Sequence, residues 1–305
     1  MKKSLPILFV LVVLSACSAV MAQTMPASPG PPKVLYLVRE DIKPGMMPAH
    51  SKHSASFATI FGKLQTPNHR IALVPLAGSE NEVVYLTGAD TFAELEGMLQ
   101  ATDKKMGAAT GTTKADLARL AGEAPLLHSA MRDMLAIYRP ELSFNPGVVL
   151  PQMRYFSITT VRLKPGKDAE YAEYVQKVIN VARTKAKVDN VHIAVFQVIS
   201  GTGGGTYLIF RPMKSLGELD DPVNMRVRAA MSDDTRKDAD KTYSDAVMSS
   251  DTSTYWLTPE MSYVEKEFAA VDPAFWNAKP EPVAAKPKPR KRTPKPAAAP
   301  APAAN

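Results

Sequence analysis

Two histidines, His50 and His53, stand three residues apart in the stretch HSKH. On a helix this spacing puts both imidazoles on one face, and such a pair binds a transition metal when at least one further ligand joins it. No nearby Cys, Asp or Glu presents itself as this further ligand. The sequence therefore predicts no metal and no cofactor. We expect instead that the two rings pack together or line a ligand pocket.

Two glutamates occur in nearly identical hexapeptides, RPELSF at 139–144 and TPEMSY at 258–263. If each hexapeptide is a strand, Glu141 and Glu260 point to one side of the sheet, where they and Tyr155 are candidates for a catalytic role around a cavity. The alternative is that each glutamate, which follows a proline at the beginning of a strand, faces water.

Other stretches that resemble functional motifs lack the residues that those motifs require. GTGGGT at 201–206 lies between two expected strands and lacks the Gly-Lys-Ser/Thr end of a phosphate loop, which favours a hairpin turn. The aspartates of 233–245 lack the central glycine and closing glutamate of a calcium loop, which favours the solvated face of a helix.

The twin hexapeptides belong to a longer internal repeat. Three further pairs of segments recur in the same order, and the offset stays between 119 and 124 residues: 38–45 with 160–166, 70–78 with 192–201, and 84–98 with 207–221. The sequence therefore predicts a tandem duplication, with one repeat at 33–149 and a second at 150–278.

Each repeat has the signals of the same set of elements. A Val/Ile/Tyr/Thr-rich strand ends at a Lys-Pro-Gly turn, a helix follows, and two strands, a second helix and a closing strand complete the unit. This β-α-β-β-α-β order is the ferredoxin-like arrangement and predicts an α+β protein. In the first helix of the second repeat, Tyr171 and Tyr174 take the places of His50 and His53, so we expect these four rings to line or fill ligand pockets.

The stretch VRLKPGKDAEYAEYVQKV, at 161–178, resembles the opening strand, turn and helix of the dimeric α+β barrel superfamily, which includes antibiotic-biosynthesis monooxygenases and NIPSNAP-like proteins. The resemblance implies that two such units face each other as a barrel, which a tandem chain could form within itself. Haem-binding members use a histidine as the axial ligand; the second repeat has only His192, at an expected strand start, so haem is not predicted. Fold resemblance does not transfer function.

Strand alternation gives an expectation for the cavity. The apolar face of the first strands, with Leu35 and Leu37 in one repeat and Phe156 and Ile158 in the other, is expected to lie under the helices. The opposite face would then line the barrel cavity, with Tyr36, Tyr155 and Ser157 among its polar groups.

Both ends of the chain differ from the body in composition. Residues 1–22 resemble an export signal, and LSAC at 14–17 resembles a bacterial lipobox with Cys17 as the lipidation site; cleavage after Ala22 is the alternative. A linker at 23–32 follows. Residues 279–305 are rich in Pro, Ala and Lys and are expected to be disordered.

This tail carries a net charge of +6, and Lys2 and Lys3 add +2. Since the whole chain has a net charge of +7, residues 4–278 have a net charge near −1. Nucleic-acid binding is therefore not expected, and anionic envelope polymers or lipid head groups are the expected partners of the tail. The sequence favours an exported bacterial protein, periplasmic or lipid-anchored, a monomer or internal pseudo-dimer that binds a small apolar or aromatic ligand in its barrel. The alternative is a cofactor-independent enzyme of the monooxygenase or isomerase type.

Overall fold

A computed structural model describes residues 30–278, and its centre is a closed barrel of eight antiparallel strands in the order β1-β3-β2-β8-β5-β7-β6-β4. The strands are β1 (Val34–Ile42), β2 (Ile71–Ala77), β3 (Glu82–Ala89), β4 (His128–Tyr138), β5 (Tyr155–Leu163), β6 (Ala194–Ser200), β7 (Thr206–Met213) and β8 (Val247–Leu257). The first four come from one half of the chain and the last four from the other. The α+β class and the intramolecular barrel predicted from the sequence are confirmed.

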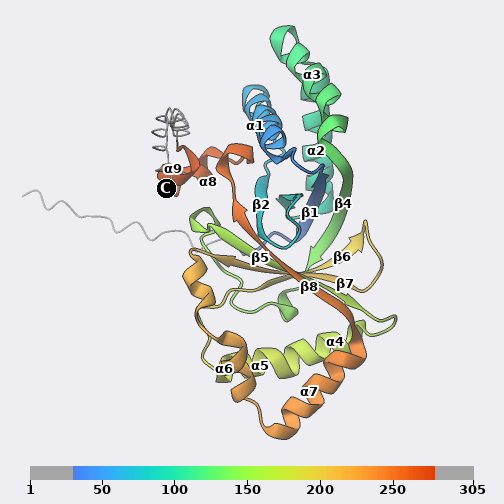
Figure 1. Cartoon of the computed structure of the whole chain (residues 1–305), viewed down its shortest axis with the longest axis vertical. Coiled ribbons are helices and arrows are strands. Elements are labelled where there is room, and N and C mark those ends of the chain that lie inside the picture. Colours follow the sequence, from blue (N-terminus) through green and yellow to red (C-terminus); the bar gives the residue numbers. More distant parts are fainter. Residues whose placement is uncertain (1–29, 279–305) are drawn as a thin grey trace, which may run out of the picture.

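Helices cover the barrel on two opposite sides (Figure 1). The helices of the first half are α1 (Met47–Leu64), α2 (Phe92–Gly107) and α3 (Gly111–Leu127). Those of the second half are α4 (Asp168–Tyr174), a π-helical turn η3 (Val175–Ile179), α5 (Asn180–Lys185), α6 (Val223–Ala229) and α7 (Asp233–Ala246), and the short α8 (Lys266–Ala270) and α9 (Pro273–Trp276) follow β8. The element order is the predicted one, with the second helix of each half divided in two.

Local sequence signals explain where several elements begin and end. The Lys-Pro-Gly turns place Gly45 and Gly166 at φ values of 78° and 79°, a conformation that glycine adopts without steric cost. Thr91 caps α2 by accepting a hydrogen bond from the Glu94 amide, while Glu94 accepts one from the Asp90 amide. The glycines of 201–205 connect β6 to β7, as predicted for a hairpin.

The twin hexapeptides are not closing strands, which corrects the sequence prediction. The closing strands β4 and β8 lie before them, and each hexapeptide forms a 3₁₀ turn, η1 (Pro140–Leu142) and η5 (Pro259–Met261). A short bridge then joins each hexapeptide to the other half: Phe144 pairs with Ile193, and Tyr263 pairs with Arg70. Strand pairs β2–β8 and β4–β6 complete the junction between the halves.

The serine of each hexapeptide makes the same hydrogen bonds in the two halves of the chain. Ser143 Oγ accepts a hydrogen bond from the Val195 amide at 3.0 Å, and Ser262 Oγ accepts one from the Ala72 amide at 2.8 Å. Both hydroxyls also donate to a carbonyl four residues earlier. Each serine therefore joins its own half to a strand of the opposite half.

The barrel interior holds a large hydrophobic core, with buried side chains from all eight strands. Leu35, Leu37, Phe156 and Ile158 belong to this core, so they face the inside of the barrel and not the helices. The face predicted to line the cavity is instead the outer one, which the helices cover. The prediction was wrong because both faces of these strands are largely buried, and alternation then does not show which face is inside.

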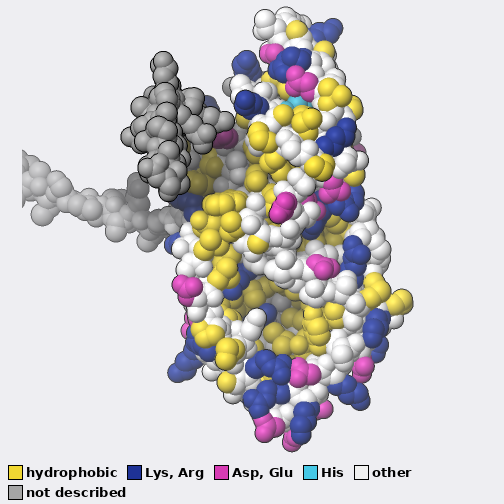
Figure 2. All heavy atoms as spheres, in the orientation of Figure 1, with side chains coloured by type: hydrophobic (Ala, Val, Ile, Leu, Met, Phe, Trp, Pro, Cys, Tyr) yellow, Lys and Arg dark blue, Asp and Glu magenta, His cyan; other side chains and the backbone are white. Residues whose placement is uncertain are grey.

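Among residues 30–278 no helix has the length and apolarity needed to cross a bilayer. The predicted export signal with Cys17 and the basic tail lie outside the described residues. Positive and negative side chains are interspersed over the face shown in Figure 2.

Candidate functional site

A pocket of about 520 Å³ opens at one end of the barrel, where β1 and β5 begin. Its wall is mainly apolar and comes from several strands, the segment before β5 and α8. The larger apolar side chains in this wall are Leu35, Ile71, Leu86, Val148, Leu150, Phe156, Phe196, Phe210, Val264 and Phe268. A pocket of this size with mostly apolar walls is typical of a small-molecule site. The pocket is thus the place where the barrel can accept a ligand.

A few polar side chains line the same pocket. His69 and Glu265 form a pair, with 3.4 Å between Nδ1 and the carboxylate. Asp90 and Glu94, which follow β3 in the sequence, also line the pocket. Partial burial lowers the pKa of His69 below its ordinary value, although the charges of Glu265 and Glu267 act in the other direction. At neutral pH His69 is therefore a neutral imidazole that can accept a proton.

The other end of the barrel is closed by a polar network. Glu82 accepts two hydrogen bonds of 3.1 Å from Arg39 and one of 2.6 Å from the Tyr255 hydroxyl. Arg39 also reaches Thr160 on the facing strand β5 at 3.4 Å. These groups fill the interior beyond the apolar core, so the pocket entered from the first end does not continue past them.

The structure does not bring the predicted catalytic candidates together. Glu141 and Glu260 are exposed on their 3₁₀ turns, and Glu141 pairs with Arg139 at 2.5 Å. Tyr155 and Ser157 lie on the outer face of β5, where Tyr155 packs against Trp256.

Tyr36 also lies on the outer face of the barrel, and its hydroxyl donates to Asp133 at 2.8 Å. None of these five predicted site residues lines the barrel-end pocket.

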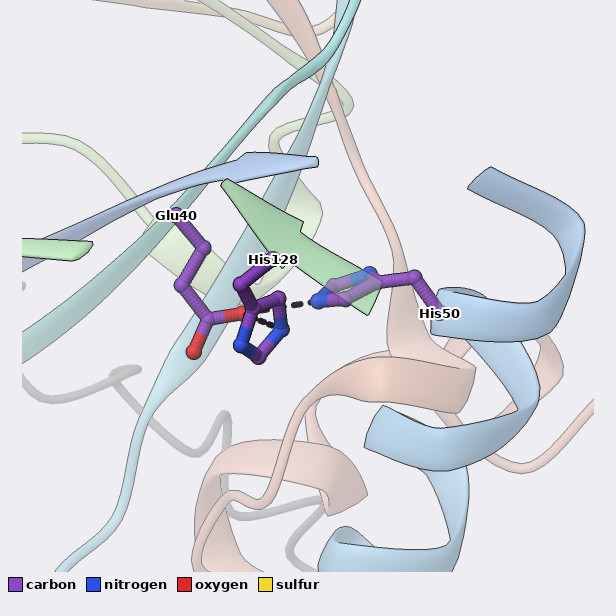
Figure 3. A group of neighbouring side chains, drawn as sticks. All are labelled: Glu40, His50 and His128. Carbon is purple, nitrogen blue, oxygen red and sulfur yellow. Dashed lines mark hydrogen bonds and ion pairs between the residues drawn. The ribbon is translucent and has the colours of Figure 1, made fainter. Parts of the chain in front are cut away.

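Of the two histidines of HSKH, His50 belongs to a second, buried group under α1 (Figure 3). His50 Nε2 lies 2.7 Å from Oε2 of Glu40 on β1, and His128 Nε2, at the beginning of β4, lies 3.4 Å from the same oxygen. The side chain of His50 is fully buried, while those of Glu40 and His128 keep 13% and 16% of their surface exposed. Three separate elements therefore bring one carboxylate and two imidazoles to a single point.

His53 does not join this group. Its Nε2 lies 3.0 Å from the carbonyl oxygen of Leu120, which ties α1 to α3, and its ring packs edge-on against Phe57. The two histidines of HSKH are both buried, as expected for ring packing, but only His50 reaches the carboxylate.

The surroundings of Glu40 include a buried positive charge. The guanidinium of Arg70 lies over the ring of Tyr85 at 4.4 Å, and its Nε is buried without a hydrogen-bond partner. Burial alone would raise the pKa of Glu40, but the hydrogen bond with His50 and the charges of His128 and Arg70 outweigh it and lower that pKa. Glu40 is therefore a carboxylate at neutral pH.

The corresponding region of the second half is a cluster of tyrosines. Tyr171 packs against Tyr174 and Tyr207, with ring centroids 6.3 and 5.4 Å apart, within a large apolar core. Burial raises the pKa of Tyr171 and lowers that of the neighbouring Arg183 to about 10. These rings pack together under the helix within that core.

Sequence reasoning missed Glu40, His128 and His69. Glu40 lies 10 residues before His50 and His128 lies 78 residues after it, on different elements, so no motif spacing connects them. A comparison of the two halves could have indicated the first two, since Glu40 and His128 have apolar counterparts in the second half.

No family model matches this sequence, and no curated protein matches it. Solved structures resemble it at low similarity. An anthrone oxidase-like protein has 11% identity and a TM-score of 0.45, covering 74% of this chain and 91% of its own. A proposed monooxygenase from Lactobacillus acidophilus has 8% identity and a TM-score of 0.42, covering 74% of this chain and 93% of its own.

A chlorite dismutase variant from Candidatus Nitrospira defluvii has 10% identity and a TM-score of 0.43, covering 75% of this chain and 92% of its own. These proteins are what the chain is similar to in fold, and likenesses of this degree carry no inference about its ligand or reaction.

Proposed function

We propose that the chain binds a small apolar or aromatic molecule in the barrel-end pocket and acts on it as an enzyme of the isomerase or cofactor-independent oxygenase type, with His69 as general base. The observation that carries this proposal is the His69–Glu265 pair on the wall of an otherwise apolar pocket of about 520 Å³. Convergent polar groups in a well-formed apolar pocket are the usual mark of an active site.

The pocket wall supports the ligand class. Phe156, Phe196 and Phe210 supply aromatic surface from three strands, and such rings pack favourably against a flat apolar molecule. The charged groups of the wall are few, so we expect a ligand with one or two polar atoms and a largely apolar body.

The chemistry follows from the state of His69. A neutral imidazole accepts a proton from an acidic C–H or O–H group of the ligand, and Glu265 stabilises the imidazolium that forms. In an isomerisation the same proton returns to a different carbon, so no electrons are gained or lost overall. In an oxygenation the deprotonated ligand passes electrons to dioxygen, which would be the co-substrate.

The binding step is tested with a solvent-sensitive naphthalene fluorophore and a panel of aromatic competitors. The wild type should bind the fluorophore in a competitor-sensitive way, and Val264→Trp, which adds bulk at the pocket wall, should weaken binding at least tenfold. Val271→Trp is the matched control, because Val271 lies close by in the sequence, is 41% exposed and does not line the pocket. Equal binding by all three proteins would reject this pocket as the ligand site.

Catalysis is tested separately with His69→Gln. If His69 is the base, this variant should retain fluorophore binding and lose turnover of any ligand that the wild type converts. If the wild type binds ligands of the panel but converts none of them, with and without dioxygen, the second candidate function applies: a carrier that holds the same class of ligand without chemistry. The same apolar pocket supports that candidate.

We also propose, on sequence grounds alone, that the protein is exported, is acylated at Cys17 and uses its basic tail to bind anionic lipid or envelope polymer. The lipobox-like LSAC and the +6 charge of residues 279–305 support this. A chain that ends at Ala278 should lose salt-sensitive adsorption to acidic vesicles, because each basic residue near such a surface contributes about 1 kcal/mol. Equal adsorption by both chains would exclude the tail as the binding element.

We infer further that the two halves arose by tandem duplication. The four sequence echoes and the shared order of strands and helices support this inference.

A further inference from the structure

We propose that Glu40, His50 and His128 form a binding site for a divalent transition-metal ion of the zinc class. The site goes beyond the proposed function, since Glu40 lies on the outer face of the barrel, five residues further along β1 than Leu35 of the pocket wall. At about 3.3 Å per residue the two positions are about 16 Å apart along the strand.

The geometry is close to that of a loaded site. The ligand atoms of the three side chains all lie within 4.8 Å of one another, and the two distances to Glu40 Oε2 are 2.7 and 3.4 Å. A tetrahedral ion with bonds of about 2.0–2.1 Å holds its ligand atoms about 3.3 Å apart. Small rotations of these side chains are therefore enough to place an ion among them.

One ligand atom makes no hydrogen bond within the protein. His128 Nε2 is buried and makes no hydrogen bond, although it is directed toward Glu40. A buried nitrogen without a partner is costly, and a bound cation would use its lone pair. His50 Nδ1 is also buried and unpaired, so the site lacks the outer hydrogen bond that usually orients a ligating imidazole. We therefore expect an affinity about 10–100-fold below that of a fully supported site.

The second half shows that the fold does not need these polar groups. The strand registers match Ile42 with His128 in the first half and Leu163 with Val247 in the second, which makes Val247 the counterpart of His128 and Val161 that of Glu40.

Tyr171 is the counterpart of His50, because each is the fifth residue after the glycine of its Lys-Pro-Gly turn. The second half thus fills the same three positions with Val, Tyr and Val inside an apolar core. A buried carboxylate with two imidazoles costs more to bury than that set. Glu40, His50 and His128 come together in the first half of the chain and have no polar counterpart group in the second. This difference between the halves indicates a role in binding.

The donor set indicates the kind of ion. Two imidazoles and one carboxylate suit Zn²⁺, Co²⁺, Fe²⁺ and Ni²⁺ better than Mg²⁺ or Ca²⁺, which prefer oxygen ligands. Three protein ligands leave a fourth position for water, and the partial exposure of Glu40 and His128 provides the side from which it enters.

The experiment uses the full-length protein, treated with chelator, dialysed and titrated with Co²⁺ and Zn²⁺. One equivalent of Co²⁺ should bind and give visible absorption bands of a low-coordinate nitrogen–oxygen site, and Zn²⁺ should displace it. Glu40→Gln and His128→Gln should each weaken Co²⁺ binding by more than the roughly 10–100-fold effect of losing an outer-shell partner.

Two further variants keep the test decisive. Glu40→Val combined with His128→Val introduces the residues of the second half, so it should remain folded, as shown by circular dichroism, and bind no Co²⁺. His192→Gln, a change of a partly exposed histidine outside the cluster, should bind Co²⁺ as the wild type does. Absence of a one-to-one Co²⁺ complex in the wild type, or unchanged binding in the folded Glu40 and His128 variants, would overturn the proposal.

Discussion

Replacing Glu82 with alanine should destabilise the barrel strongly, because this carboxylate compensates the charge of Arg39 inside it. The Glu82 side chain is only 6% exposed and that of Arg39 16% exposed. The alanine variant would leave Arg39 with a single contact of 3.4 Å to Thr160, and it would also leave the Tyr255 hydroxyl, 1% exposed as a residue, without its acceptor.

The expected loss in the free energy of unfolding follows from this burial. Removal of one partner from a buried ion pair costs about 3–5 kcal/mol, because the other charge stays uncompensated. For a domain of 150–250 residues, 1 kcal/mol corresponds to about 2–4 °C in melting temperature. We therefore expect Glu82→Ala to lower the melting temperature by about 6–20 °C.

Calorimetry and urea unfolding measure the change. Arg132→Ala is the control, since Arg132 lies 3.8 Å from Glu82 but is 56% exposed, and its loss should cost about 1 kcal/mol or less. The combination Arg39→Met, Glu82→Leu and Tyr255→Phe removes both charges and the buried hydroxyl that bonds to Glu82, and it should recover most of the lost stability. A Glu82→Ala cost no larger than that of Arg132→Ala would refute the argument that this network is a buried, compensated charge group.

The remaining predictions concern the junction, the base and the export signal. Ser143→Ala and Ser262→Ala should each cost about 1–3 kcal/mol in urea unfolding, because each leaves a buried strand amide unpaired; costs near zero would contradict this. The kcat/KM of the proposed reaction should rise with pH through an inflection below 6.5, because burial lowers the pKa of His69 and only its neutral form accepts a proton; a flat profile would exclude this base. Labelling with an alkyne fatty acid should mark the wild type and not Cys17→Ser, and unlabelled wild type would favour cleavage after Ala22.

Much of the candidate site could not have been predicted from sequence. The pair His50 and His53 was identified from its helical spacing, but a spacing argument treats both residues alike, and the structure separates them. His53 is bound to a carbonyl of α3, while His50 meets Glu40 and His128. The hexapeptides resemble strands, which predicts that both glutamates share one face of a sheet, but both glutamates are exposed on 3₁₀ turns.

The order of strands and helices, the Lys-Pro-Gly turns and the hairpin at 201–206 follow from the amino-acid sequence alone. These features follow from patterns within a few residues, hydrophobic periodicity and turn chemistry, and the second repeat offers each pattern a second time. Which strand face lies inside the barrel, and which distant side chains meet, depends on how the strands close and the helices pack.

Closure of the barrel and its helical cover bury both faces of β1 and β5, so the alternation that usually distinguishes inside from outside is lost. The meeting of Glu40, His50 and His128 depends on the pairing of β1 with β4 and the packing of α1 over them, contacts that bring together residues up to 88 positions apart.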